Sequence, residues 1–418
     1  MSTRVPLAIL HLPQQKYSCH GCGDCCRDFT VQLRPDDLER LEAQGYARDL
    51  GEPVTVEFRG AHYLRQRSDG ACYFLEDDGR CRIHADHGFN EKPVACRLFP
   101  FNLAPDARGP SAGLNFACQS VQRNAGAGLE THAKDLKRAL KELPEVDTRM
   151  PPRLSGRLRA DAEEINAVSS GIDSWISSDV SARTRWDGLA WLAQSFSAAK
   201  LDHVRGSRFK ELVNVLTSAL PEELDHLPFS DAGMGQRRLL RQAVFARIED
   251  PRIHDGAKRN SMFVRLEQWR RSRRWTSGRG IPEGLPRGWE PAESFSAIEH
   301  VGFPEDQQQW NDIDDVITRW LRSTVLGGRG WGAGCYGFSV VEGLQALVLN
   351  LACVGWLARL NSAGRGLDTI DLDAVRESLG RIDRAAGRAK WLGSGAEKMR
   401  LKYFANDDGL RRIIAYAW

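Results

Sequence analysis

The sequence has little net charge and no long apolar run. Its 58 basic and 55 acidic residues leave a formal net charge of +3 over 418 residues, so the whole chain carries no electrostatic signature of nucleic-acid or membrane-surface binding. The longest apolar stretch, residues 344–360, contains Gln345 and Asn350 and is shorter than the roughly 20 apolar residues that a membrane span requires. It predicts a buried helix, and we expect no membrane span in this protein.

The N-terminus lacks the features of an export signal. Residues 1–13 hold one basic residue, and their short apolar stretch is broken by Pro6 without a small-residue cleavage site. We therefore expect a cytoplasmic location, where cysteines stay reduced and bind metals more often than they form disulfides.

Motifs of common catalytic sites are absent as well. There is no HExxH zinc-protease motif, no Ser-His-Asp set and no strand followed by Gly-x-Gly-x-x-Gly. The Gly-rich segment 326–335 follows a helical pattern, so it predicts a helix–helix connection. No motif supports S-adenosylmethionine, but that cofactor, if bound, would be expected at this segment. Whether the chain is an enzyme stays open, and its catalytic and cofactor-binding residues are unknown.

What the sequence does have is a concentration of cysteines near its N-terminus. Eight of the ten precede residue 120, while Cys335 and Cys353 lie in apolar surroundings typical of buried small side chains. The eight candidate metal ligands are Cys19, Cys22, Cys25, Cys26, Cys72, Cys81, Cys96 and Cys118.

The first three of these cysteines have the spacing of ferredoxin cluster loops, with two residues between each pair. Gly21 and Gly23 between them permit the positive φ angles of a tight metal-binding knuckle. We expect an iron–sulfur cluster of the [4Fe-4S] type, with zinc as the open alternative. Eight thiolates suffice for two four-ligand sites or for one cluster plus one zinc. Neighbouring side chains point apart, so Cys25 and Cys26 are expected to serve different sites or, for one of them, the core.

Three histidines and three arginines lie beside the cysteines in the sequence. The histidines could replace a thiolate ligand, but eight cysteines suffice, so we expect surface or hydrogen-bonding roles for them. Each arginine directly follows a cysteine, and its charge could offset that of a cluster. The six residues are His20, His84, His87, Arg27, Arg82 and Arg97.

The patterns along the chain predict an α+β protein in two parts. Residues 1–125 form a small irregular cysteine-rich domain, with strands predicted near 29–33 and 54–58 and a short helix opened by Pro35. Residues 126–418 form a larger, mostly α-helical domain, with a split into two subdomains near 276–305 as an open alternative. Helical patterns in it cover 155–169, 183–200, 208–219, 236–249, 260–274, 306–325, 339–360, 371–388 and 393–403.

A basic and aromatic segment, residues 264–290, contains seven arginines with Trp269, Trp275 and Trp289 between them. Such a mixture can follow a nucleic-acid backbone and stack on bases. A nucleic-acid footprint normally extends over more of a chain, so we expect an exposed helix end with tryptophans packed inward and no nucleic-acid partner.

The eight cysteines and their local contexts resemble the bacterial CxxCxxCC (YkgJ-type) cysteine-cluster family, a putative zinc- or iron-chelating domain, over residues 17–120. This resemblance implies metal chelation. More distantly, the layout is similar to that of flagellin lysine-N-methylase, which implies methyl transfer to protein lysines in the presence of an iron–sulfur cluster. The opening cysteines of this chain are more compactly spaced than those of that enzyme.

The function expected is therefore that of a metal-binding protein, with a protein-modifying enzyme similar to lysine-N-methylases as the first hypothesis. The alternatives are a non-catalytic interaction module held together by metal and a redox or electron-transfer protein. The first two hypotheses both predict a protein substrate or a protein partner.

Overall fold

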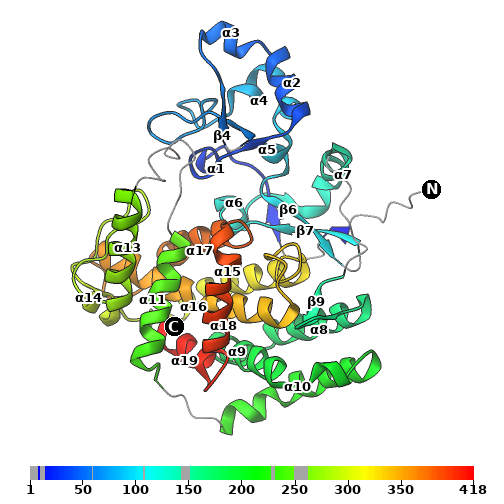
Figure 1. Ribbon diagram of the computed structural model, residues 1–418, viewed down its shortest axis with the longest axis vertical. Coiled ribbons are helices and arrows are strands. Elements are labelled where there is room, and N and C mark those ends of the chain that lie inside the picture. The colour runs from blue at the N-terminus through cyan, green and yellow to red at the C-terminus, as the bar shows by residue number, and fades with distance from the viewer. Residues whose placement is uncertain are drawn as a thin grey trace.

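The computed structural model describes residues 8–9, 15–58, 60–106, 109–142, 151–226, 231–248 and 262–418. The cysteine-rich N-terminal region stands at the top of Figure 1, above a larger assembly of helices. The small sheets are confined to the first part of the chain and to one hairpin near residue 155, and helices dominate the rest. The predicted α+β class, with a small irregular region followed by a larger helical part, is confirmed.

The small region is built on a three-stranded antiparallel sheet of order β3-β5-β4, in which Val56 pairs with Tyr63. The strand predicted at 54–58 and the helix predicted at Pro35 are confirmed, and β3 lies at the end of the strand predicted near 29–33. Leu33, Leu64 and Phe74 are among the buried residues of its own small core. Its elements are β2 (Lys16–Tyr17), α1 (Asp24–Asp28), β3 (Gln32–Leu33), α2 (Pro35–Ala43), α3 (Tyr46–Leu50), β4 (Thr55–Phe58), β5 (Ala61–Leu64), α4 (Arg82–His87), η1 (Phe89–Glu91) and α5 (Val94–Leu98).

The segment from residue 101 to 142 lies against the helical part. Its strands form a second sheet of order β1-β7-β6, and Leu114, Phe116 and Val121 belong to the large hydrophobic core that the helices share. The domain boundary at residue 125 stays a prediction. The elements here are β1 (Ala8–Ile9), β6 (Phe101–Asp106), β7 (Gly109–Leu114), α6 (Gln119–Gln122), β8 (Ala127–Gly128), η2 (Leu129–His132) and α7 (Ala133–Glu142).

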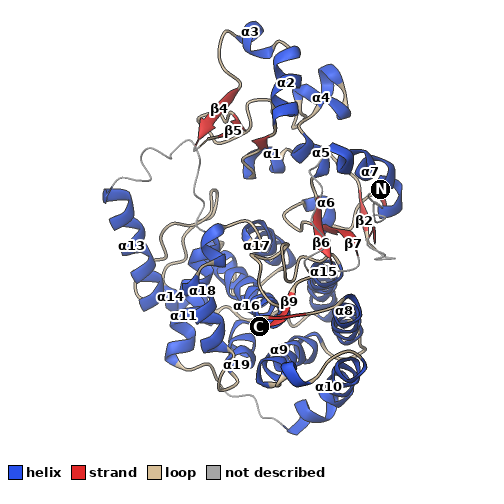
Figure 2. Cartoon of the chain, turned by 45° about the vertical axis from the view of Figure 1, so that its right-hand side comes forward, coloured by secondary structure: helices blue, strands red, loops and turns tan. Residues whose placement is uncertain are grey.

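The helical part is organised around α16, which lies in its middle (Figure 2) and packs against α9, α11, α17 and α19. Residues on both sides of 276–305 share this core, and the subdomain split stays a prediction. The elements are β9 (Arg153–Ser155), β10 (Leu158–Arg159), α8 (Ala162–Ile176), α9 (Ala182–Ala198), η3 (Leu201–His203), α10 (Ser207–His226), α11 (Met234–Ile248), α13 (Met262–Ser277), α14 (Phe295–His300), α15 (Gln307–Leu326), α16 (Val340–Gly364), α17 (Leu372–Ala385), η5 (Lys390–Gly393), α18 (Gly395–Phe404) and α19 (Gly409–Ala417).

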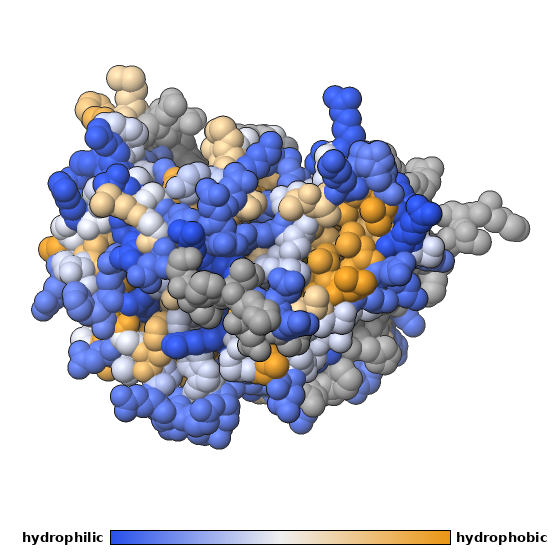
Figure 3. All heavy atoms as spheres, turned by 90° about the horizontal axis from the view of Figure 1, so that it is seen from below, coloured by the Kyte–Doolittle hydropathy of each residue, from blue (hydrophilic) through white to orange (hydrophobic). Residues whose placement is uncertain are grey.

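Helix α16 is long and apolar enough to cross a membrane by length and composition, and 89% of its most apolar window is buried inside the protein. A helix that is hydrophobic on all sides and surrounded by other helices is the core helix of a bundle. The face of the helical part that is seen from below is mostly hydrophilic (Figure 3). The prediction that residues 344–360 form a buried helix is confirmed.

One predicted helix was given too early a start. The periodicity at 155–169 predicts a helix, but residues 153–159 form the β9–β10 hairpin and α8 begins only at Ala162. Asp161 accepts a hydrogen bond from the backbone N–H of Glu164, and the Glu164 carboxylate accepts one from the N–H of Asp161. This capping box fixes the helix start, because it satisfies backbone donors that have no partner within the helix.

The Gly-rich segment 326–335 joins α15 to α16 inside the core, so the predicted helix–helix connection is confirmed. A Cβ atom on Gly327 would stand 2.7 Å from the Cα of Gly113 in β7, and one on Gly343 would stand 2.1 Å from the carbonyl oxygen of Gly330. These glycines permit close backbone packing.

Candidate metal centre and the cleft beside it

The knuckle formed by residues 19–26 has the backbone that its glycines predict. Gly21 and Gly23 have φ angles of 73° and 75°, and α1 begins directly after Gly23. The turn before Cys81 packs on this knuckle, since a Cβ atom on Gly79 would lie 2.4 Å from the carbonyl oxygen of Gly21. Only glycine fits so close an approach at a positive φ, so Gly79 brings the Cys81 segment to the knuckle.

Four cysteines gather at the core of the small region, and we call them the inner set. Cys72 is buried in that core, and its backbone N–H donates to the carbonyl oxygen of Cys26 at 2.7 Å. Helix α2 holds the Cys96 helix in place, because the buried carboxylate of Asp37 accepts from the N–H of Val94 at 3.0 Å. The inner set consists of Cys26, Cys72, Cys81 and Cys96.

The other four cysteines lie within electrostatic reach of Tyr17, and we call them the outer set. Burial raises the pKa of Tyr17 above its usual value, and the four cysteines raise it further when they are thiolates. Cys118 comes from a segment far along the sequence from the knuckle, and it lies within electrostatic reach of Cys25 and Cys19. The outer set consists of Cys19, Cys22, Cys25 and Cys118.

The two sets meet at Cys25 and Cys26, whose Sγ atoms lie 4.0 Å apart. This is closer than we expected from neighbouring side chains that point apart. Within the part of the chain that the structure describes, no three His, Cys, Asp or Glu side chains already stand in the tight arrangement that holds a metal ion. The eight thiols thus lie in neighbouring positions but not at coordinating distances, so metal binding would require their Sγ atoms to move closer together.

The chemistry of the thiols fits a metal site. All ten cysteines are free of disulfides. Burial raises the pKa of Cys22 to about 12 and those of Cys72 and Cys118 to about 11, so these side chains are neutral thiols at pH 7 until a cation displaces their protons. Buried thiolates would be costly without a cation, and a bound metal supplies the compensating charge.

Lys92 is a neighbour of the inner set that the sequence did not indicate. Burial would lower the pKa of Lys92, but Cys96, Cys81 and Cys25, when they are thiolates, raise it above its usual value. A cation in this position can offset part of the negative charge of a thiolate centre. In the sequence, Lys92 stands four residues before Cys96, but a single lysine at that spacing does not predict a role beside a metal centre.

The histidines and arginines beside the cysteines are engaged elsewhere. His20 hydrogen-bonds to the hydroxyl of Ser120, in keeping with the hydrogen-bonding role expected of it. Arg82 lies 3.4 Å from the carboxylate of Asp86, and Arg27 donates to the carbonyl oxygen of Cys22 at 3.4 Å. The hypothesis that these arginines donate directly to sulfur finds no support among the described contacts.

Glu142, at the end of α7, ties that helix to the small region through two arginines. Arg97 donates to it at 2.8 Å and Arg40 at 3.2 Å. The hydrogen bonds from Arg97, reinforced by both positive charges, lower the pKa of Glu142 from 4.5 to about 2. A carboxyl group whose pKa is lower in the folded state stabilises the protein above its unfolded pKa, and this stabilisation is lost as the pH falls through the folded pKa.

We predict that Glu142→Gln lowers the urea midpoint of unfolding at pH 7. The difference in midpoint between variant and wild type should narrow as the pH falls from 4.5 towards 2, because protonation then removes the same charge from the wild-type carboxyl group. Urea unfolding at a series of pH values measures this. Glu130→Gln, at an exposed position outside these ion pairs, is the control. A difference that does not change with pH would contradict the prediction.

The segment that carries Cys118 is anchored to the helical part by buried polar residues. Asp383 of α17 is 1% exposed, and its carboxylate accepts hydrogen bonds from the N–H of Phe116 at 2.7 Å and from Trp320 at 3.0 Å. Arg319 of α15 donates to the carbonyl oxygen of Val121 at 2.9 Å. The helical part therefore fixes the position of the fourth cysteine of the outer set.

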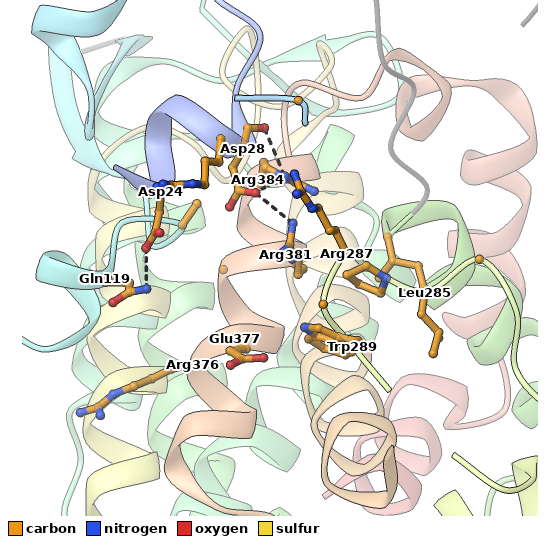
Figure 4. Close-up of a pocket in the computed structure, with 18 of the residues that line it drawn as sticks. Asp24, Asp28, Gln119, Leu285, Arg287, Trp289, Arg376, Glu377, Arg381 and Arg384 are labelled. Carbon is orange, nitrogen blue, oxygen red and sulfur yellow. Dashed lines mark hydrogen bonds and ion pairs between the residues drawn. The ribbon is translucent and has the colours of Figure 1, made fainter. Parts of the chain in front are cut away.

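A cleft of about 1220 Å³ opens between α1, the Cys118 segment, α17 and the loop after α13. Figure 4 shows Arg381 and Arg384 of α17 reaching Asp28 of α1, at 3.2 and 3.1 Å, with Arg287 and Trp289 on the neighbouring loop. Eight arginines and six carboxylates line this cleft. Helix α1 lines the cleft through Asp24, Arg27 and Asp28 and also carries Cys25 and Cys26, so the cysteines lie next to the cleft along the chain.

The basic and aromatic segment 264–290 divides between core and surface. Trp275 is fully buried, as expected for an inward-packed tryptophan, whereas Trp269 is exposed and Trp289 lines the cleft. The sequence did not predict the cleft itself, because the arginines of α17 join this segment only in the folded chain.

The comparisons with known proteins match only part of the chain, and the family model covers the cysteine-rich region. Residues 18–123 match the family model CxxCxxCC, described as a putative zinc- or iron-chelating domain. An uncharacterized protein of Methanocaldococcus jannaschii is 30% identical over 86 residues, which are 21% of this chain and 29% of that protein. No solved structure matches the chain. Residues 18–123 of this protein are therefore similar to the CxxCxxCC family, whose domain is described as a putative zinc- or iron-chelating domain.

Proposed function

We propose that the CxxCxxCC domain holds metal in two four-cysteine centres, an iron–sulfur cluster on the outer set and zinc or a further cluster on the inner set. The observation that carries this proposal is the grouping of eight thiols from five separate segments of the chain into two neighbouring sets. Thiolate is the ligand that zinc and iron–sulfur clusters share, and four of them complete either kind of site.

The outer set has the features of a cluster site. Three of its cysteines are separated by two residues each and a distant fourth completes them, as in ferredoxin-type ligation. Cys19 is exposed, which gives electrons or a partner access to this centre. The cluster, when bound, supplies a redox-active or Lewis-acidic group, and the chain's own residues shape its surroundings.

The inner set has the features of a structural centre. Cys72 is 7% exposed, and the four thiols lie at a small apolar core with Lys92 beside them. A closed four-thiolate site needs no open coordination position, and such sites contribute directly to folding in small domains. Its role is to hold the sheet and α5 together beneath α2.

Iron, zinc and acid-labile sulfide analysis with an absorption spectrum, on anaerobically purified protein, tests the proposal. We expect iron and sulfide in equal amounts with absorption extending into the visible range. Cys22→Ala and Cys118→Ala should both remove the sulfide and the visible absorption of the outer-set cluster, while Cys335→Ala, a buried cysteine of the helical part, should leave them unchanged. Sulfide that remains in both outer-set variants would come from a further cluster on the inner set. Zinc without sulfide would reject the cluster, and loss of all metal from every variant of either set would indicate one shared centre.

Methylation of protein lysines remains the alternative that rests on resemblance alone. Calorimetry with S-adenosylmethionine on the metal-loaded protein tests it, and an absence of heat would reject it. A non-catalytic interaction module predicts capture of a protein partner without turnover, and an electron-transfer protein predicts a reversible reduction potential. The cleft beside the outer set favours a bound ligand or partner in each case.

A further inference from the structure

Three arginines from three separate elements line the cleft without a salt bridge among the described residues. Arg27 comes from α1 beside the cysteines, Arg123 follows α6, and Arg287 comes from the loop after α13. Arg27 and Arg287 both lie within electrostatic reach of Asp69, a third residue of the cleft lining. All three side chains are exposed. Arg27 donates to the carbonyl oxygen of Cys22 and Arg287 to that of Asp69, and these neutral acceptors leave both positive charges available to an anion.

The carboxylates of the cleft are already engaged by other groups. Asp28 is held by Arg381 and Arg384, and Glu267 pairs with Arg271. Asp24 accepts from Gln119, Glu377 accepts from Asn361 at 3.0 Å, and Asp69 accepts from the backbone N–H of Ala71 at 2.9 Å. Asp373 lies 3.6 Å from Arg376. Amide hydrogen bonds leave the charges of Asp24 and Glu377 in place, so the sign of the cleft follows from the count of its lining groups. Eight arginines against six carboxylates leave a formal charge of +2.

The loop that carries Arg287 also presents an aromatic ring. The N–H of Trp289 donates to the carbonyl oxygen of Pro286 at 3.1 Å, and Gly288 has a φ of 79°, which together form a type II turn. Trp275 donates to the carbonyl oxygen of Glu283 at 2.8 Å and anchors the start of the loop. Trp289 packs against the large core on one side and lines the cleft on the other, so its ring is held in place.

We propose that this cleft binds a phosphate-bearing small molecule that also carries a planar ring, a ligand of the nucleotide class. Guanidinium groups recognise phosphate through paired hydrogen bonds, and a held indole ring provides a stacking surface for a base. The cleft exceeds the usual size of a small-molecule pocket, which leaves room for a phosphate chain beside the ring. The proposal does not depend on which metal the CxxCxxCC domain holds.

The proposal is tested by calorimetric titration of the full-length protein, purified with its metal, with ADP, pyrophosphate and adenosine. We expect ADP to bind most tightly, pyrophosphate to bind and compete with it, and adenosine to bind weakest. Arg123→Gln and Arg287→Gln should each weaken ADP binding by about tenfold or more, because a charge-assisted hydrogen bond is lost. Trp289→Leu should weaken ADP but not pyrophosphate.

Matched controls come from the same region. Arg279→Gln removes an exposed arginine of the same loop outside the cleft, and Trp269→Leu removes an exposed tryptophan of α13, and neither should change ADP affinity. Urea midpoints of all variants show whether folding is retained. The proposal is overturned if the protein binds neither ADP nor pyrophosphate, if S-adenosylmethionine or a single-stranded oligonucleotide binds while ADP does not, or if the cleft variants bind like the controls.

Discussion

Replacing Cys72 with alanine should release the metal of the inner set and leave the small region unfolded while the helical part stays intact. Cys72 is 7% exposed at the centre of a core of only ten buried hydrophobic residues. A core of this size supplies little stability by itself, whereas a structural zinc contributes on the order of 10–16 kcal/mol in zinc-finger peptides. Metal analysis and limited proteolysis within residues 16–98 measure the effect.

Cys353→Ala is the matched control for this variant. Cys353 is also fully buried, but it lies in α16, far along the chain from the cysteine centre. Its loss leaves a small cavity and should cost about 1 kcal/mol without any change in metal content. If Cys72→Ala retains all its metal and its resistance to protease, the inner set is not a metal centre.

Replacing Asp383 with alanine should cause a large loss of stability in the helical part. The carboxylate pairs with Arg329 at 3.0 Å, and both side chains are almost fully buried. Removal of one partner leaves the other charge buried and unpaired, which typically costs about 3–5 kcal/mol. Two further donors, the N–H of Phe116 and the indole N–H of Trp320, lose their acceptor as well.

Urea unfolding monitored by circular dichroism measures this loss. Asp373→Ala, on the same helix, is the control, because the Asp373 side chain is 72% exposed and its ion pair with Arg376 spans 3.6 Å. Exposed pairs contribute about 0–1 kcal/mol, so this variant should unfold near the wild type. Equal losses in the two variants would show that the buried network around Asp383 does not hold the fold together.

The Asp383 variant also links stability to the metal site. Phe116 lies two residues before Cys118, so loss of its hydrogen bond loosens the segment that brings Cys118 to the outer set. We expect Asp383→Asn, which keeps the shape of the side chain, to retain more metal than Asp383→Ala.

Much of the local structure could be predicted from the sequence, because it depends on neighbouring residues. The alternating pattern at 54–58 predicted β4, Pro35 predicted the start of α2, and the apolar run at 344–360 predicted the buried α16. Where the prediction was wrong, a local competitor decided the outcome, as with the Asp161–Glu164 capping box at the start of α8. Two helices were not predicted: α14, which lies inside the predicted loop 276–305, and α19 near the end of the sequence.

The candidate site was predictable only in its ligand chemistry. The positions of Gly21, Gly23 and the first cysteines predicted the knuckle, because the two-residue spacing of the cysteines is a local property of the sequence. The approach of Gly79 to the knuckle, the charge of Lys92 and the arginines of α17 come from contacts between distant segments, and no sequence spacing reveals them. Metal identity, cytoplasmic location and the protein partner remain predictions.

The sequence by itself determined that this protein carries a thiol-rich metal-binding region ahead of a helical part, because side-chain chemistry and local periodicity are written in neighbouring residues. Only the tertiary structure decided which cysteines lie together and that a cleft opens beside them. The physical reason is that distant helices position both residues. Hydrogen bonds between the backbone of the Cys118 segment and Asp383 and Arg319 hold Cys118, and ion pairs with Arg381 and Arg384 hold Asp28. These partners belong to α15 and α17, which begin more than 280 residues after the knuckle.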